Sequence, residues 1–285
     1  MKNQPQKLQL APDRVEVLNK IKEHERMAEF DIDVENDPPA PVLMPNKVDY
    51  LQKKLPTKFK RRIAYIMAGM FLKSSLKNKN LVIKQINGIE NWANIEGGAV
   101  ITSNHFNPME SFALYYTYAK TGRKRQKRMY RVIREGNYTA APKGVGIIMK
   151  YCDTLPLSSN RKTMVNFMRS VDTVLQQGHY VQIYPEQAMW WNYKKPRPLK
   201  DGAFKIAVRN NVPVVPVFIT MQDSKRYGKD GYPIQEYTIN IFKPIYPDPN
   251  KSKDQNIDDM LTKNEQLCSE CYEKTYGIPL EYDTE

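Results

Sequence analysis

From residue 81 onward, short stretches with the pattern of strands alternate with longer stretches with the pattern of helices, and this alternation limits the possible folds more than any other feature. The predicted strands cover 81–86, 99–103, 129–133, 154–157, 180–184, 212–219 and 237–245. The predicted helices cover 108–120, 162–177, 202–210 and 254–276. Such alternation produces a mostly parallel sheet with helices on its faces. We therefore expect an α/β fold with a mostly parallel central sheet flanked by helices.

The first 80 residues have a different pattern and predict a helical segment. Residues 13–30 carry apolar side chains at near-helical spacing, and residues 35–45 are rich in proline. Residues 56–77 combine a basic end with an apolar stripe, which is the pattern of a helix lying on a membrane surface. A helix packed on the protein core would have the same spacing, so both interpretations remain open. We expect a membrane-facing helical segment at 1–80, an α/β domain at 81–250, and a C-terminal helix and tail at 251–285.

The net charge of +13 indicates a polyanionic partner such as nucleic acid, anionic lipid or a phosphorylated substrate. The densest basic cluster consists of Lys120, Arg123, Lys124, Arg125, Lys127, Arg128, Arg131 and Arg134. Anionic lipid attracts each such side chain with about 1 kcal/mol. Nucleic acid attracts them as well, and a solvated helix end has the same composition. Charge alone therefore does not choose among these interpretations.

The three cysteines are too few for a disulfide framework and suit a reducing cytosol. Cys268 and Cys271 form a C-x-x-C pair, but a zinc site needs about four ligands and the sequence offers no second ligand pair. We therefore interpret the pair as structural and expect no metal site.

The first candidate catalytic residues follow the predicted strand 99–103. His105 comes two residues after this strand, at the end where open α/β sheets bind ligands. We expect the next helix to have Asn107 as its N-cap and Pro108 as its first residue. A Glu110 carboxylate in the first turn can fix the tautomer of the His105 ring and leave the other ring nitrogen free as a base. The spacing from Asn107 to Glu110 is also that of a capping box, in which the glutamate only holds the helix start.

A second acidic residue follows the predicted strand 180–184. Glu186 comes after Pro185, which favours a turn, and an ordinary turn would have the same composition. A long loop rich in aromatic and basic residues comes next, with Trp190, Trp191, Tyr193, Lys194, Lys195 and Arg197. This composition suits a membrane interface or a lid over an amphiphile. It also suits stacking on single-stranded nucleic acid.

In this order the motifs resemble those of the lysophosphatidic-acid acyltransferases, in the glycerolipid acyltransferase superfamily. The similarity covers about residues 81–219. The matching stretches are Asn87-Gly88-Ile89-Glu90-Asn91, Asn104-His105-x-x-x-x-Glu110, Pro142-Lys143-Gly144 with the strand 154–157, Tyr184-Pro185-Glu186, and Val212 to Val217. They look like the family's G-x-E-N entry, its N-H-x4-D motif with glutamate for aspartate, its second motif, its F-P-E-G motif and its fourth motif. Each is short, but together in this order they form a specific pattern.

The resemblance implies transfer of a fatty acyl group from acyl-CoA or an acyl carrier protein to a lysophospholipid hydroxyl, with 1-acylglycerol-3-phosphate as the first candidate acceptor. It implies that His105 deprotonates the hydroxyl and that Glu110 orients His105. The implied substrate-binding residues are Asn104, Arg161, Tyr184, Pro185, Glu186 and Lys200. It implies an acyltransferase domain at 81–250 and no cofactor besides the acyl donor. We expect a peripheral protein on the cytoplasmic side of an anionic membrane, without nucleic acid.

The sequence departs from the family at two arginines. The third motif usually continues G-T-R, but Gln187, Ala188 and Met189 stand there, and Ser159 stands near the arginine that ends the second motif. A phosphate site needs a guanidinium or an ammonium group. The candidate substitutes are Arg161, Lys194, Lys195, Arg197 and Lys200. A different lipid or amphiphilic alcohol as acceptor, a catalytically idle lipid-surface protein, and a nucleic-acid-binding protein are the alternatives.

Overall fold

The computed structural model describes residues 10–142 and 144–285, without the side chain of Arg125. The first nine residues of the segment 1–80, and the lysine of Pro142-Lys143-Gly144, lie outside the described residues. The strands are β1 (Val82–Asn87), β2 (Ala99–Ser103), β3 (Met129–Ile133), β4 (Thr154–Pro156), β5 (Tyr180–Ile183), β6 (Val214–Tyr227) and β7 (Pro233–Ile241). The helices are α1 (Pro12–Arg26), α2 (Leu55–Lys77), α3 (Ile89–Ala93), α4 (Glu110–Lys120), α5 (Glu135–Thr139), α6 (Val145–Tyr151), α7 (Arg161–Gln176), α8 (Gly202–Asn210) and α9 (Lys253–Tyr276), with 3-10 turns at Pro45–Lys47 and Arg123–Arg125.

The strands form one sheet in the order β1-β7-β6-β2-β5-β3-β4. Strands β6, β2, β5, β3 and β4 run parallel to one another, and β1 runs parallel to β7. The β6–β7 pair is antiparallel. This arrangement confirms the predicted mostly parallel sheet, and it places β2 centrally, between β5 and β6.

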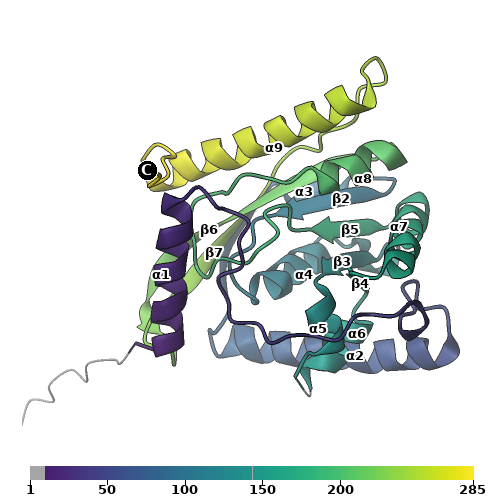
Figure 1. Ribbon diagram of the computed structural model, residues 1–285, viewed down its shortest axis with the longest axis horizontal. Helices are drawn as coiled ribbons and strands as arrows, with labels where there is room; N and C mark the ends of the chain where they lie inside the picture. Colours follow the sequence, from purple (N-terminus) through teal and green to yellow (C-terminus); the bar gives the residue numbers. More distant parts are fainter. Residues whose placement is uncertain (1–9, 143) are drawn as a thin grey trace, which may run out of the picture.

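Helices cover both faces of the sheet, because residues along a strand point alternately to opposite faces. Ala99 and Ile101 of β2 pack in one hydrophobic cluster with α4, and Val100 packs in the other with α7, α8 and α9. All five residues of β2 are buried, as expected for a central strand covered on both sides. In Figure 1, α8 and α9 lie above the sheet and α2 lies below it.

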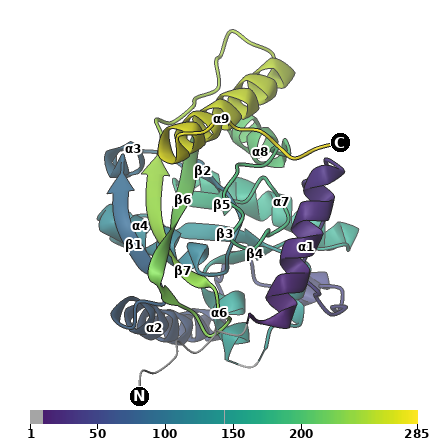
Figure 2. The same cartoon turned by 90° about the vertical axis from the view of Figure 1, so that its left-hand side faces the viewer.

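The N-terminal segment packs beside the carboxyl end of β5. Helix α1 contacts the loop that follows β5 and stands beside the main body of the molecule in Figure 2. It ends at Arg26 rather than at the predicted residue 30, because Ala28 has a left-handed conformation with φ of 55°. The predicted boundaries of the α/β domain, at residues 81 and 250, fall in the turn before β1 and in the turn before α9. None of the helices in 10–142 and 144–285 has the length and apolar character that a bilayer-spanning segment needs.

The β6–β7 hairpin differs most from the prediction. Strand β6 continues to Tyr227, eight residues past the predicted end, and β7 begins at Pro233 rather than at 237. Beyond the buried Met221, the extension from Gln222 to Tyr227 is polar and mostly exposed, so its hydrophobic pattern gave no strand signal, but it pairs with β7 at Gln222, Asp223 and Tyr227. The short helices α3, α5 and α6 were not predicted, because five to seven residues carry too little periodicity.

Candidate active site

The segment that carries His105 is held at the end of β2 by its neighbour Asn104. The Asn104 side chain donates from Nδ2 to the Ile219 carbonyl at 3.0 Å and accepts from the Ile219 N–H at 2.9 Å. These two bonds continue the pairing between β2 and β6 beyond the last strand residue. Asn104 is 5% exposed, so the structure places this predicted substrate-binding residue in a backbone-positioning role.

Glu110 contacts both the His105 ring and the backbone that precedes α4. One carboxylate oxygen contacts Nδ1 of His105, and the other accepts from the N–H groups of Phe106, at 2.7 Å, and Asn107, at 3.0 Å. Glu110 is fully buried. It therefore holds the helix start and contacts the imidazole at the same time, so the two interpretations of this residue are compatible.

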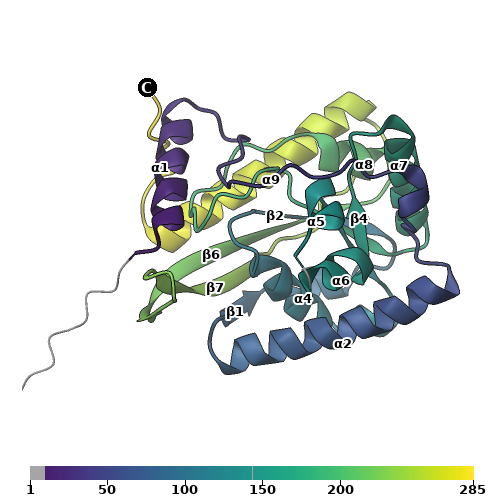
Figure 3. The same ribbon diagram turned by 60° about the horizontal axis from the view of Figure 1, so that its bottom comes forward.

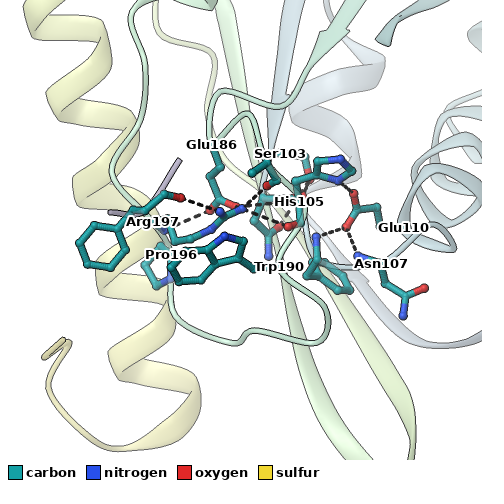
Figure 4. A network of polar contacts seen from close by, with 12 residues as sticks. Ser103, His105, Asn107, Glu110, Glu186, Trp190, Pro196 and Arg197 are labelled. Carbon is teal, nitrogen blue, oxygen red and sulfur yellow. Dashed lines mark hydrogen bonds and ion pairs between the residues drawn. The ribbon is translucent and has the colours of Figure 1, made fainter. Parts of the chain in front are cut away.

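The helix begins two residues later than predicted. Pro108 and Met109 form a turn closed by the Glu110 N–H donating to the Asn107 carbonyl at 3.0 Å. The Asn107 side chain accepts from the Met109 N–H at 3.0 Å, which stabilises this turn. The turn brings the Glu110 carboxylate back toward His105, as Figure 4 shows.

The His105 ring is fixed on its flat side by Tyr184. The two rings stack at 4.0 Å between centroids with an interplanar angle of 11°. The Tyr184 hydroxyl is hydrogen-bonded to the Ser111 hydroxyl at 2.9 Å. Burial, followed by the nearby Glu110 charge, raises the pKa of Tyr184 above its ordinary value, so this hydroxyl stays protonated at neutral pH.

The geometry leaves Nε2 of His105 as the free ring nitrogen. Nδ1 is occupied by Glu110, and Nε2 makes no hydrogen bond within the part of the chain that the structure describes. The His105 side chain is 22% exposed, whereas its Glu110 partner is completely buried. A carboxylate on Nδ1 favours the tautomer in which Nε2 carries a lone pair, which is the form a general base requires.

The His105 backbone is held by a buried ion pair between Glu186 and Arg197. The Glu186 carboxylate accepts from the His105 N–H at 2.9 Å, from the Arg197 guanidinium at 2.8 Å and from the Arg197 N–H at 3.1 Å. Arg197 also donates to the carbonyls of His105, Ala188 and Phe30. Figure 4 shows this pair on one side of the His105 segment and Glu110 on the other. Both members are at most 4% exposed.

Arg197 is one of the candidate substitutes for the missing phosphate-binding arginines. In the structure, both of its terminal guanidinium nitrogens donate hydrogen bonds to groups of the protein. Glu186 is likewise engaged with protein N–H groups, among them the N–H of His105. Its expected direct contact with the acceptor stays a prediction. An arginine eleven residues after the glutamate, inside a loop, gave no sequence signal for this pairing.

The two tryptophans of the loop 187–200 are buried. Trp190 is fully buried and Trp191 is 6% exposed, because Val17 and Ile21 of α1 and Val34 pack over them. The expectation of an aromatic membrane interface or a nucleic-acid platform at this loop is therefore wrong. Its backbone instead runs beside the His105 segment, where the Trp190 N–H donates to the His105 carbonyl at 3.1 Å.

Of the remaining predicted substrate-binding residues, Pro185 and Lys200 lie in the segment after β5, and Arg161 lies beyond the edge strand β4. Pro185 is buried next to Glu186, and its carbonyl accepts from the Lys200 N–H at 3.0 Å. The Lys200 ammonium pairs with Asp31 at 2.7 Å. Arg161 begins α7, which follows the edge strand β4, three strands away from β2. At about 4.8 Å per strand, this separation keeps Arg161 out of the group around His105.

Much of the basic cluster supports the fold. The Lys127 ammonium donates to the carbonyls of Ile95, Glu96 and Gly97. Arg128 pairs with the buried Asp153. The Arg123 side chain donates to the carbonyl of Ala93 at 2.6 Å. These cations are therefore not available as a continuous surface for a polyanion.

A cavity of about 330 Å³ lies behind the Glu186–Arg197 pair, beneath α9 and the C-terminal tail. Its lining includes Pro196, Leu199, Phe218, Cys268 and Tyr282. His105 does not line it. Burial raises the pKa of the Cys268 thiol well above its ordinary value, so this cysteine is an unreactive apolar wall residue, as expected for a structural C-x-x-C pair.

Comparisons with known proteins agree with this fold. The family model described as Acyltransferase matches residues 83–220, a stretch that includes both His105 and Glu186. A crystal structure of the 1-acyl-sn-glycerophosphate (LPA) acyltransferase PlsC from Thermotoga maritima is similar, with a TM-score of 0.55 and 17% sequence identity over 81% of this chain and 87% of that chain. No curated protein matches the sequence. The chain is thus an acyltransferase. Its fold is similar to that of the lysophosphatidic-acid acyltransferase structure, and the Acyltransferase family model covers just under half of the chain.

Proposed function

We propose that the enzyme transfers a fatty acyl group from a thioester donor, acyl-CoA or an acyl carrier protein, to a lysophospholipid hydroxyl in phospholipid synthesis. The main support for this proposal is the contact between Glu110 and Nδ1 of His105, which leaves Nε2 free. The first acceptor to test is 1-acylglycerol-3-phosphate, which is the substrate class in the name of the similar PlsC structure. At 17% identity that structure supports the fold, so the acceptor remains part of the proposal.

In the proposed reaction, His105 acts as a general base without a covalent acyl-enzyme. Nε2 takes the proton of the acceptor hydroxyl while its oxygen attacks the thioester carbonyl carbon. The C–S bond then breaks, and the imidazolium returns the proton to the leaving thiolate. The buried Glu110 charge stabilises the imidazolium, and base catalysis of this kind contributes about 10² to 10⁴ in rate. The acyl donor is a co-substrate, and the proposal invokes neither a cofactor nor a metal.

The test is acyl transfer by the purified enzyme to 1-acylglycerol-3-phosphate from labelled acyl-CoA. We expect His105→Ala to reduce turnover at least about 10²-fold without unfolding the protein. His24→Ala is the matched control, because His24 also contacts a glutamate five residues later through Nδ1, with Glu29 at 2.8 Å, outside the site. Normal turnover by His105→Ala, or equal losses in both variants, would reject the role of His105.

We also propose that α2 places the enzyme on the cytoplasmic side of an anionic membrane as a peripheral protein. Its inward face carries small buried residues, Ala64, Ala68 and Ser75. The opposite face exposes large apolar side chains: Leu55, Phe59, Ile66 and Met70 are 56% to 79% exposed. Lysines and arginines flank this stripe. An exposed apolar stripe with basic flanks is the composition that binds lipid surfaces.

Sedimentation with anionic liposomes tests this placement. We expect the Phe59→Ser/Met70→Ser variant to lose most of its binding, because it removes two large apolar side chains of the stripe that are each 67% exposed. The control is Val165→Ser/Ile278→Ser, which removes two exposed apolar side chains outside α2. Unchanged sedimentation of the α2 variant would exclude α2 as the lipid-binding element.

A different lipid or amphiphilic alcohol as acceptor is the second candidate. It is favoured by the third motif, where Met189 replaces the usual arginine and Arg197 pairs with Glu186 instead. A panel of lyso-acceptors against one acyl-CoA distinguishes the two, since the preferred acceptor has the highest kcat/KM. The intact contact between His105 and Glu110 argues against a catalytically idle protein.

A further inference from the structure

Residues 27–54, which we call the N-terminal strap, connect α1 with α2, as Figure 3 shows, and contacts with Trp190, Arg134 and Ser158 place residues 32–43 beside the carboxyl ends of β5, β3 and β4. The strap is anchored by buried side chains, with Val34 fully buried and Leu43 1% exposed. Its backbone is tied to the body of the enzyme as well. The Trp190 indole donates to the Ile32 carbonyl at 2.9 Å, and the Thr163 hydroxyl donates to the Leu43 carbonyl at 2.8 Å. The strap therefore has a defined position over the ligand-binding edge of the sheet.

Three carboxylates of the strap pair with two cations on this edge. Asp33 and Asp37 both contact the Arg134 guanidinium, the latter at 3.0 Å. Asp31 contacts the Lys200 ammonium at 2.7 Å. Arg134 follows β3, the neighbour of β5, and the Lys200 N–H donates to the carbonyl of Pro185 just beyond β5, so both cations lie near the end of β5. Both cations are about half exposed.

These pairs differ from the buried pair of Glu186 and Arg197. Within residues 10–142 and 144–285, Arg134 and Lys200 have no carboxylate partner outside the strap. Exposed pairs of this kind contribute little to stability, and a competing anion can displace them. A phosphate monoester carries a charge of about −1.5 to −2 near neutral pH and accepts several hydrogen bonds from a guanidinium. It is therefore a stronger partner for Arg134 than either aspartate alone.

We propose that Asp33 and Asp37 determine acceptor specificity by occupying Arg134, so that a phosphate-bearing headgroup must displace them before it binds. This inference rests on the proposed function, because it concerns the acceptor of the same reaction. The strap lowers the affinity for acceptors with a phosphate monoester and leaves the affinity for uncharged acceptors unchanged. Specificity in this enzyme is then set partly by a competing intramolecular anion.

The test compares Asp33→Asn/Asp37→Asn with the wild type in detergent micelles, using lysophosphatidate and the uncharged monoacylglycerol as acceptors. We expect the KM for lysophosphatidate to fall about three- to tenfold, the effect of releasing two exposed ion pairs, and the KM for monoacylglycerol to stay the same. The matched control is Asp258→Asn/Asp259→Asn on α9, which removes the same charge and breaks the exposed pair of Asp259 with Lys251. An equal fall in KM in the control would reveal a general charge effect and overturn the proposal.

A binding measurement separates this inference from the proposed function. Calorimetric titration with glycerol 3-phosphate needs no acyl transfer, and we expect Asp33→Asn/Asp37→Asn to bind it about three- to tenfold more tightly than wild type. Adding Arg134→Gln to that variant should abolish the gain. Unchanged binding overturns the role of the strap even if acyl transfer is normal. Tighter binding in an enzyme that acylates no lysolipid supports the anion site and rejects the proposed reaction instead.

Discussion

The pairing of Glu186 with Arg197 predicts that Glu186→Gln weakens the fold and the catalytic site together. Glutamine removes the charge opposite a buried guanidinium and places an NH₂ group against N–H donors of His105 or Arg197. Breaking a buried ion pair at one partner costs about 3 to 5 kcal/mol. At about 2 °C per kcal/mol for a chain of this size, we expect Tm to fall by roughly 6 to 10 °C.

A double-mutant cycle measures whether the pair itself is responsible. Arg197→Met should cost a similar amount, and Glu186→Gln/Arg197→Met should cost much less than the sum, with a coupling energy of at least about 2 kcal/mol. The control cycle is Lys194→Met with Asp223→Asn, an exposed pair at 3.0 Å, for which we expect a coupling below about 1 kcal/mol. Calorimetric or circular-dichroism melting curves provide all the values.

Kinetics then decides how Glu186 acts. Releasing the His105 backbone should lower kcat about 10- to 100-fold at temperatures where the variant stays folded, because small displacements of a catalytic group are costly. The acceptor KM should change little. The reasoning is refuted if Glu186→Gln keeps its Tm and raises only the acceptor KM, since the carboxylate would then bind the acceptor directly.

Two further changes test the groups that fix the His105 ring. We expect Glu110→Gln to lower kcat about 10²- to 10³-fold and to lower Tm, because the amide cannot accept from the imidazole and both backbone N–H groups at once; Glu110→Asp, which keeps the charge, should retain more activity. Unchanged kcat with a lowered Tm would show that Glu110 is only a helix cap. Tyr184→Phe keeps the ring stacking and loses the bond to Ser111, so stability should fall by about 1 kcal/mol and kcat by less than about threefold. A drop of 100-fold in kcat would instead place the Tyr184 hydroxyl in the reaction.

Elements defined by local pattern could be predicted from the sequence. The strands Ala99–Ser103 and Met129–Ile133 and the helix Gly202–Asn210 have the predicted bounds, because apolar runs and flanking glycines are local signals. The encounter of His105 with Glu110 was also predictable, since both lie within one strand-to-helix connection. The helix start was misplaced because Pro108 favours a first helical position, whereas here it occupies a turn.

Contacts between distant parts of the chain could not be predicted. Arg197 carries no motif, and its partners are the carbonyls of Phe30, His105 and Ala188 as well as Glu186. The burial of Trp190 under α1 depends on packing between segments about 170 residues apart, which composition does not encode. The loop 187–200 therefore has the composition of an exposed interface, although its tryptophans belong to a hydrophobic cluster.

These distant contacts determine when the site can form during protein synthesis. His105 emerges from the ribosome 81 residues before the Glu186 that holds its N–H, and Asn104 emerges 115 residues before Ile219. A nascent chain that ends before β6 has His105 with both Glu110 and Glu186, but it lacks the Ile219 backbone that holds Asn104. We expect such fragments to be inactive, so that acyl transfer begins only after the second half of the sheet has folded.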